Sequence, residues 1–249
     1  MKKILLLFVI TFLLGMGYAA YDNRTTKQRD KTNEEQTVKK NALVSESETK
    51  SKVNVPDVPL ILQKPELDRG CEVTALAMLL QHAGVEVDKM ELAEKIKKDP
   101  TPYKNENGTY YYGNPNDGFV GDIYTFDKMG YGVYHEPVAE LAEYYLPDNI
   151  QDLTGKSFED AVLKPLSTGK PVWIITNATF NKLSESEFRT WNTPSGQVKI
   201  TWNEHSVVVT GYDDQYVYFN DPLGAATKAE RKGFEVAWVQ MGSQAITYK

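Results

Sequence analysis

The chain has 249 residues, 41% hydrophobic and 25% charged, which is long enough for one well-buried domain or two small ones. Its formal net charge is −6, and residues 55–249 alone hold 18 basic and 28 acidic residues, a net charge of about −10. A surface this acidic repels phosphates, so nucleic-acid binding is disfavoured.

The first twenty residues have the pattern of an export signal. Lys2 and Lys3 precede an apolar run over residues 4–20 that ends in small residues, as secretory signals do. The run also reaches the short end of a membrane span, so cleavage and retention as an anchor both stay open. We expect a protein secreted or anchored on the outer face of the membrane, with residues 1–20 engaging the membrane or export machinery.

Residues 21–54 are polar and have almost no large apolar side chain. Such a segment cannot bury enough surface to fold, so we expect a disordered linker here. Residues 55–249 form the expected folded domain, which we take to be a monomer.

The first half of this domain is predicted to be mainly helical. Residues 55–62 are extended by their prolines. Apolar residues recur at three- and four-residue steps over 71–83, with Asp68 as a possible cap and Gly84 at the end. Further helices are predicted over 88–97, 119–129, 138–145 and 158–166, with a loop over 101–117.

The second half contains the predicted strands, at 171–176, 204–212, 215–220 and 244–248. A tight turn at 213–214 joins the second and third strands, and a helix is expected over 228–241. Helices followed by antiparallel strands indicate an α+β fold, with a helical half packed on a sheet half and a cleft between them.

Cys71 is the only cysteine, and it begins the first predicted helix. Backbone N–H groups and the helix dipole favour an anion at that position, so a thiolate is stabilised there. The preceding Gly70 is expected to open access to the sulfur. The alternative is a buried structural cysteine on an apolar helix face.

A thiol nucleophile needs an imidazole to accept its proton. His82 lies on the same helix, roughly 16 Å from Cys71 by helical rise, and His135 lies in a connecting segment. His205 opens a strand, where a side chain can point into a cleft. It follows Cys71 by 134 residues, within the separation of about 130–150 found in papain-like enzymes.

The imidazole needs a partner that fixes its orientation. His205 and Asp221 lie eight residues on either side of residue 213, so we predict that they pair across the mouth of the hairpin. Asn220 could serve instead, but strand alternation puts it on the other face. Gln63 could donate to an oxyanion together with the Cys71 backbone N–H. The histidines and the cysteine have no zinc-type spacing, and neither a metal nor a cofactor is expected.

These residues carry a resemblance to a known family. Val58-Pro59, Gln63 and the run from Gly70-Cys71-Glu72 to Leu80 resemble the stand-alone relatives of the bacteriocin-processing (double-glycine leader) cysteine peptidases, cysteine peptidase family thirty-nine. The segments 113–115, 118–121, 205–212 and 220–223 resemble its central loop and its closing His and Asp-Pro blocks. The resemblance implies a papain-like fold, a triad of Cys71, His205 and Asp221, and Gln63 in the oxyanion site.

The resulting hypothesis is an exported cysteine hydrolase that cleaves peptide or amide bonds of a peptide or protein substrate through a thioester. One alternative is a surface-displayed peptide- or glycan-binding module that keeps the fold without turnover, with its tyrosine-rich loop and tryptophans lining a groove. Another is an amidase or endopeptidase that acts on cell-wall peptides.

Overall fold

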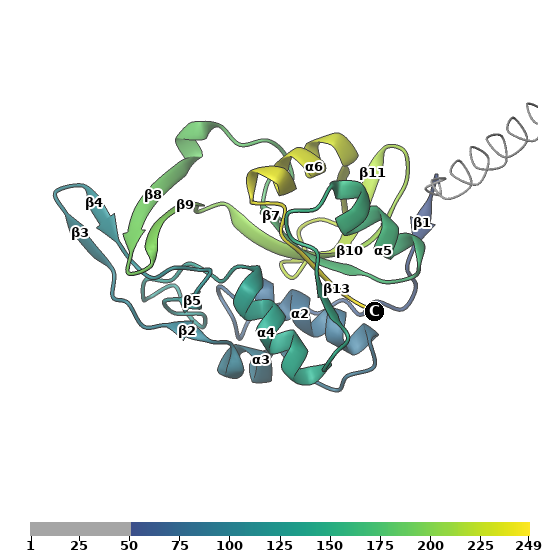
Figure 1. Cartoon of the computed structure of the whole chain (residues 1–249), viewed down its shortest axis with the longest axis horizontal. Helices are drawn as coiled ribbons and strands as arrows, with labels where there is room; N and C mark the ends of the chain where they lie inside the picture. The colour runs from purple at the N-terminus through teal and green to yellow at the C-terminus, as the bar shows by residue number, and fades with distance from the viewer. Residues whose placement is uncertain (1–50) are drawn as a thin grey trace, which may run out of the picture. The chain divides into compact units, whose positions relative to one another are not determined.

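A seven-stranded antiparallel sheet forms the centre of the folded unit (Figure 1). The computed structural model describes residues 51–249, and the predictions for residues 1–50 lie outside them. The strand order is β12-β11-β10-β7-β13-β6, and β1 pairs with the far end of β10. The strands are β1 (Val53–Asn54), β6 (Ile150–Asp152), β7 (Val172–Asn177), β10 (Glu204–Tyr212), β11 (Tyr216–Asn220), β12 (Lys228–Glu230) and β13 (Ala245–Tyr248).

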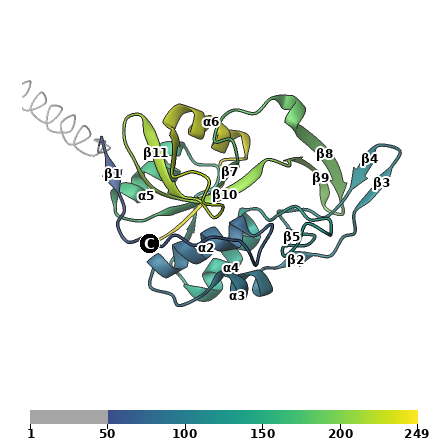
Figure 2. The same cartoon turned by 180° about the vertical axis from the view of Figure 1, so that it is seen from behind.

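Helices cover both faces of this sheet, as the two opposite views agree (Figures 1 and 2). One face carries α2 (Cys71–His82), α3 (Lys89–Lys95) and α4 (His135–Tyr145). The other face carries a π-helical turn (Glu159–Leu163), α5 (Lys164–Ser167) and α6 (Arg231–Gln240). None of the helices within residues 51–249 combines the length and apolarity needed to cross a membrane.

The central strands have continuous apolar stretches, residues 172–175 of β7 and 207–209 of β10, because both of their faces are buried there. In β7, Trp173 and Ile175 pack in the cluster with α2, whereas Val172 and Ile174 pack in the cluster with α5 and α6. Successive side chains of a strand point to opposite faces, so a strand between two helical layers needs apolar residues at every position.

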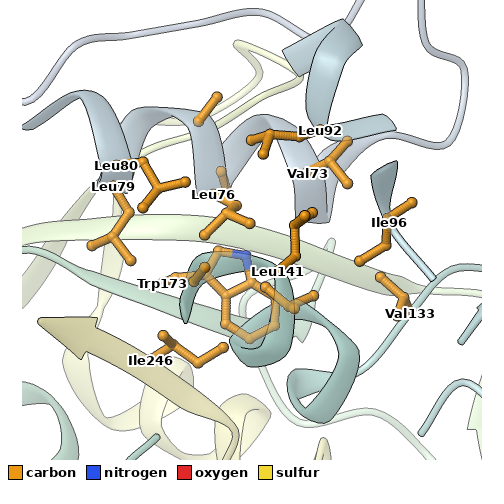
Figure 3. Packing of buried hydrophobic residues seen from close by; sticks show 14 of the residues in the cluster. Val73, Leu76, Leu79, Leu80, Leu92, Ile96, Val133, Leu141, Trp173 and Ile246 are labelled. Atoms are coloured by element: carbon orange, nitrogen blue, oxygen red, sulfur yellow. The ribbon is translucent and has the colours of Figure 1, made fainter. Parts of the chain in front are cut away.

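Helix α2 lies deep in the first of these cores. Its first ten residues are all buried, and Figure 3 shows Val73, Leu76, Leu79 and Leu80 around Trp173. A helix that is apolar on all sides belongs in the interior. The prediction that Asp68 caps this helix is wrong: the N-cap is Gly70, without a side-chain cap. Asp68 instead accepts a hydrogen bond from the Phe126 backbone N–H at 3.1 Å.

A second, four-stranded sheet extends from the centre and contains elements that the sequence pattern did not predict. Its order is β3-β4-β8-β9, and a short parallel pair, β2 with β5, lies beside it. The predicted loop over 101–117 thus contains a hairpin. The strands are β2 (Lys98–Asp99), β3 (Lys104–Glu106), β4 (Thr109–Tyr111), β5 (Phe119–Val120), β8 (Phe188–Thr193) and β9 (Gly196–Thr201).

The predicted helix over 119–129 is wrong, because the chain turns there after two strand residues. Gly121 has a φ of +80°, and a Cβ on it would lie 2.2 Å from the Tyr112 hydroxyl oxygen. Asp122 then closes a turn by accepting hydrogen bonds from the backbone N–H groups of Tyr124 and Thr125 at 2.8 and 2.9 Å. Apolar residues at helical spacing therefore do not form a helix at this position.

The other predicted elements agree with the structure apart from their ends. The predicted helix over 228–241 begins with three residues of strand, β12, before α6. Residues 53–54, assigned to the linker from the sequence, pair with Gly211 and Tyr212 of β10. The α+β class is confirmed, with Cys71 on a helix and His205 and Asp221 on the sheet side.

Candidate active site

Cys71 is the first residue of α2, and a tryptophan holds this end of the helix against the sheet. The indole N–H of Trp173 on β7 donates to the backbone carbonyl of Glu72 at 2.9 Å. Both groups are buried, so the bond is shielded from water. The hydrogen bond from β7 therefore fixes the position of the first turn of α2, and with it Cys71, relative to the sheet.

Gly70 is required for packing. Its φ of −115° is open to any residue. A Cβ at this position would lie 2.5 Å from Leu67 Cδ1 and 2.6 Å from Leu67 Cβ. Leu67 is fully buried, so it could not move aside without opening the core.

His205 and Asp221 form a buried pair, with His205 Nε2 2.7 Å from Asp221 Oδ1. They do not face each other directly, because Val208 opposes Asn220 in the register of β10 and β11. That register places Asp221 opposite Val207, so the prediction of direct opposition is off by two residues. A bulge between Val209 and Gly211 shifts the register, and the contact is diagonal, which long side chains can span.

The surroundings of Asp221 determine which nitrogen of His205 carries the proton. Oδ1 also accepts from the Leu223 N–H at 2.8 Å, and Oδ2 accepts from Ala225 and Ala226 at 3.1 and 3.2 Å. Burial opposes ionisation, but the bonds from His205 and the backbone outweigh it and hold the pKa of Asp221 below its usual value. An ionised carboxylate only accepts. Nε2 therefore donates, and Nδ1 of the neutral ring is free to accept a proton.

Cys71, His205 and Gln63 line one cavity of about 580 Å³. The strand β10 brings His205 to it and α2 brings Cys71. Four apolar side chains that are half exposed also line this cavity. They are Phe126, Met129, Trp202 and Leu223. An apolar lining with a few polar groups at one point is typical of ligand and substrate sites.

The Cys71 thiol does not engage His205 in this structure. Sγ donates to Glu72 Oε2 at 3.2 Å, and among residues 51–249 no hydrogen bond joins Cys71 to His205. Burial, then the charges of Glu72 and Glu204, raise the pKa of the Cys71 thiol well above its usual value. The helix dipole, expected to favour the thiolate, is therefore opposed by two neighbouring acids.

Sequence reasoning missed those two acids. Glu72 is buried, and burial raises its pKa to about 7. Burial, and then the charge of Glu72, raise the pKa of Glu204 well above its usual value. The available signal was their position, since one acid directly follows Cys71 and the other directly precedes His205.

Gln63 is buried beside the cavity, and its amide is already in use. Nε2 donates to the backbone carbonyls of Leu67 and Asp68 at 3.2 and 3.0 Å. Within residues 51–249, its Oε1 atom is buried without a hydrogen-bond partner. One of the amide hydrogens must leave its carbonyl before Gln63 can donate to a substrate.

The other two histidines lie elsewhere and have their own partners. His82 Nδ1 is 2.6 Å from the Tyr248 hydroxyl, at the end of α2 remote from Cys71. His135 begins α4, and its Nδ1 is 2.6 Å from Asp152 Oδ2. Neither bears on Cys71.

In the described part of the chain, one group of side chains is close enough together to share a metal ion or a proton. The ligand atoms of Cys71, Glu72 and Glu204 all lie within 4.8 Å of one another. The Cys71 thiol donates to Glu72 Oε2 within this group. No histidine of residues 51–249 belongs to such a group.

Comparisons with known proteins agree with this fold. The chain is 48% identical over 205 residues to the uncharacterised protein YvpB of Bacillus subtilis (strain 168), covering 81% of this chain and 78% of that protein. A crystal structure from Bacillus anthracis, described as a C39-like peptidase, is 56% identical with a TM-score of 0.74. It covers 80% of this chain and 98% of its own. Residues 55–246 match the Peptidase_C39 like family, and the chain belongs to that family.

Proposed function

We propose that this protein is a cysteine peptidase in which Cys71 is the nucleophile, His205 the base and Asp221 the residue that orients the base. The observation that carries the proposal is the buried His205–Asp221 pair beside the cavity that Cys71 lines. Because Nε2 donates to Asp221, Nδ1 can accept a proton from a thiol. Membership in a peptidase-like family supports the same reaction class.

In the proposed reaction, the Cys71 side chain turns from Glu72 toward His205 and gives its proton to Nδ1. The thiolate attacks a peptide carbonyl, and the oxyanion is held by the Cys71 backbone N–H and the Gln63 amide. The N–H groups of a first helical turn have no intrahelical acceptor, which leaves the Cys71 donor free for this task. His205 returns its proton to the leaving amine, and water then hydrolyses the thioester.

The proposed substrate is a peptide or protein outside the cell. Export is supported by the apolar run that follows Lys2 and Lys3. The half-exposed apolar side chains at the cavity support binding of apolar residues next to the scissile bond. The Lys50–Lys249 segment is one compact unit, and a 56% identical chain spanning 80% of this one has been crystallised, so residues 51–249 suit biochemical work.

The test is hydrolysis of a complex peptide mixture in H₂¹⁸O, with new carboxyl termini identified by mass spectrometry. Residues 51–249 should produce ¹⁸O-labelled termini, and the Cys71→Ser and His205→Ala variants should reduce their yield at least 100-fold. Equal yields from the Cys71→Ser variant, or none from the unmodified protein, would contradict a cysteine peptidase.

A peptide-binding module is the second candidate, favoured by the hydrogen bond that holds the Cys71 thiol on Glu72 instead of His205. It predicts saturable retention of peptides from the same mixture with no new termini. It also predicts that the Cys71→Ser variant retains the same peptides.

A further inference from the structure

The buried carboxyl group of Glu72 and the half-buried one of Glu204 lie beside the Cys71 thiol, and the proposed mechanism does not use them. Glu72 Oε2 accepts from Cys71 Sγ at 3.2 Å, and its Oε1 accepts from the Val133 N–H at 2.8 Å. Glu204 comes from the start of β10, and its Oε1 is buried without a partner among residues 51–249.

The two carboxyl groups face one small space next to Gly132. A Cβ on Gly132 would lie 2.3 Å from Glu72 Oε1 and 3.2 Å from Glu204 Oε2. Two like charges so close disfavour each other's ionisation, so the pair keeps a proton to higher pH than two separate carboxyl groups would. Gly132 is therefore the residue that leaves room for both.

No cation of the described chain neutralises this pair. Lys64 and Arg69 line the cavity, but Lys64 pairs with Asp68 at 3.2 Å, and Arg69 donates to the carbonyls of Asp122 and Thr125.

The remaining titratable neighbours are also accounted for. Tyr131 and Tyr134 hydrogen-bond to each other at 2.8 Å. Burial raises the pKa of both phenols, which stay neutral. His205 faces the site from β10, and its Nε2 is held by the ionised Asp221. The Cys71 thiol and Nδ1 of His205 are thus the groups beside the acid pair that the other neighbours leave unengaged.

We propose that Glu72 and Glu204 act as a positioning pair that decides whether the Cys71 proton stays on Glu72 or passes to His205. This inference rests on the proposed function. With one proton on the pair, the Glu72 carboxylate accepts the thiol hydrogen bond and Cys71 stays protonated. When a second proton from solvent neutralises the pair, Glu72 is no longer an anion and no longer holds the thiol proton by accepting its hydrogen bond. The S–H bond then breaks, its proton binds Nδ1 of His205, and a thiolate–imidazolium pair forms.

The pH dependence follows from which protons are bound. Burial raises the pKa of Glu72 to about 7, so the pair is neutral below that pH and carries a negative charge above it. The thiolate–imidazolium pair is stable only beside a neutral acid pair. As pH increases through the acid range, the thiol loses its proton beside imidazolium and the alkylation rate of Cys71 rises. Above about pH 7 the acid pair becomes negative, the thiolate is no longer stabilised, and the rate falls again. An ordinary thiol shows no such fall, since its reactivity only rises with pH.

The test is the rate of Cys71 alkylation by iodoacetamide from pH 5 to 9, read by intact-protein mass spectrometry. EDTA is present, so that protons alone titrate the site. In the unmodified protein the rate should peak near pH 6, fall about threefold between pH 6.5 and 7.5, and approach a tenfold fall per unit above pH 8. Glu72→Gln should abolish the fall. Glu204→Gln should move it to lower pH, because the variant removes the like charge that opposes ionisation of Glu72.

Glu86→Gln is the matched control, because Glu86 is exposed and the change removes the same charge. If the acids had only a structural role, their substitution would change the alkylation rate by the same factor at every pH. The pH at which the rate falls would stay the same. Thermal melting identifies a variant that has not folded, and the other variant then carries the test.

Three outcomes decide the matter. Loss or displacement of the falling limb in the acid variants, with an unchanged limb in Glu86→Gln, supports the positioning pair. Fast, His205-dependent alkylation whose fall above about pH 7 is the same in both acid variants overturns this inference and leaves the peptidase proposal standing. A protein whose alkylation is as slow as that of His205→Ala at every pH overturns both.

Discussion

The hydrogen bonds of Asp221 allow the effect of Asp221→Asn to be worked out in detail. The carboxylate accepts four donors: His205 and Leu223 on Oδ1, and Ala225 and Ala226 on Oδ2. An asparagine has one acceptor oxygen, so its NH₂ must face one of these two sides. Facing Ala225 and Ala226, it would leave two backbone N–H groups without an acceptor. Facing His205, it leaves only the Leu223 N–H unpaired, provided that the imidazole changes tautomer.

The second arrangement is therefore preferred, and it has two measurable consequences. A fully buried orphaned N–H costs about 1–3 kcal/mol, and because Leu223 is half exposed we expect about 1 kcal/mol, which lowers the melting temperature of a domain of this size by roughly 2–4 °C. The changed tautomer puts the proton on Nδ1, which then cannot accept the Cys71 proton. We expect peptide hydrolysis to fall by about 10³–10⁴, as for the equivalent change in a serine protease triad.

Asp213→Asn is the matched control for this substitution. Asp213 lies in the turn of the same hairpin and accepts hydrogen bonds from the backbone N–H groups of Gln215 and Tyr216. An asparagine can keep both of these bonds on Oδ1 and changes only the site that accepts from the Tyr218 hydroxyl at 2.7 Å, so the substitution should leave the alkylation rate of Cys71 unchanged. If Asp221→Asn leaves hydrolysis and Cys71 alkylation within twofold of the unmodified protein, the assigned role of Asp221 is refuted.

The remaining predictions concern the neighbours of Cys71. Glu72→Gln should raise the melting temperature at pH 8 but hardly at pH 4.5. Burial raises the pKa of Glu72 to about 7, so its stabilising contribution is present below the unfolded value and is lost as pH rises through 7. Gln63→Ala should lower kcat by about 10²–10³ with little change in KM, measured on any peptide cleaved in the hydrolysis assay. Trp173→Phe removes the bond to the Glu72 carbonyl and should lower the free energy of unfolding by about 1–3 kcal/mol in urea titrations. Equal stability of the Trp173→Phe variant would show that this bond does not hold the start of α2.

Much of the fold could be predicted because its signals are local. Helix α2 and strands β7, β10 and β11 have continuous apolar runs with turn residues between them. The failures occur where long-range contacts decide. Residues 119–129 have helical spacing, but the close approach of Tyr112 to Gly121 requires a turn. The β8–β9 hairpin is largely polar on its exposed face, so its strands carry little of the apolar pattern that identifies a strand.

The candidate site divides in the same way. The choice of His205 and Asp221 follows from a hairpin that the sequence predicts, although its turn spans residues 213–216 and so leaves the register two residues from the predicted one. The pairing of the two acids could not be predicted, because Glu72 and Glu204 are 132 positions apart in the chain and meet only when α2 packs on β10. A charged residue on a buried helix face is the feature that would have indicated such a partner.

The central claim is that Cys71 and His205 form a reactive pair, and alkylation of residues 51–249 with iodoacetamide at pH 6 tests it most directly. The account predicts that Cys71 reacts at least tenfold faster than in the His205→Ala variant, since a free thiol with a pKa of about 8.5 is almost fully protonated at that pH. Equal rates in the two proteins, or a Cys71 that reacts only after unfolding, would contradict it and leave the peptide-binding module as the better account.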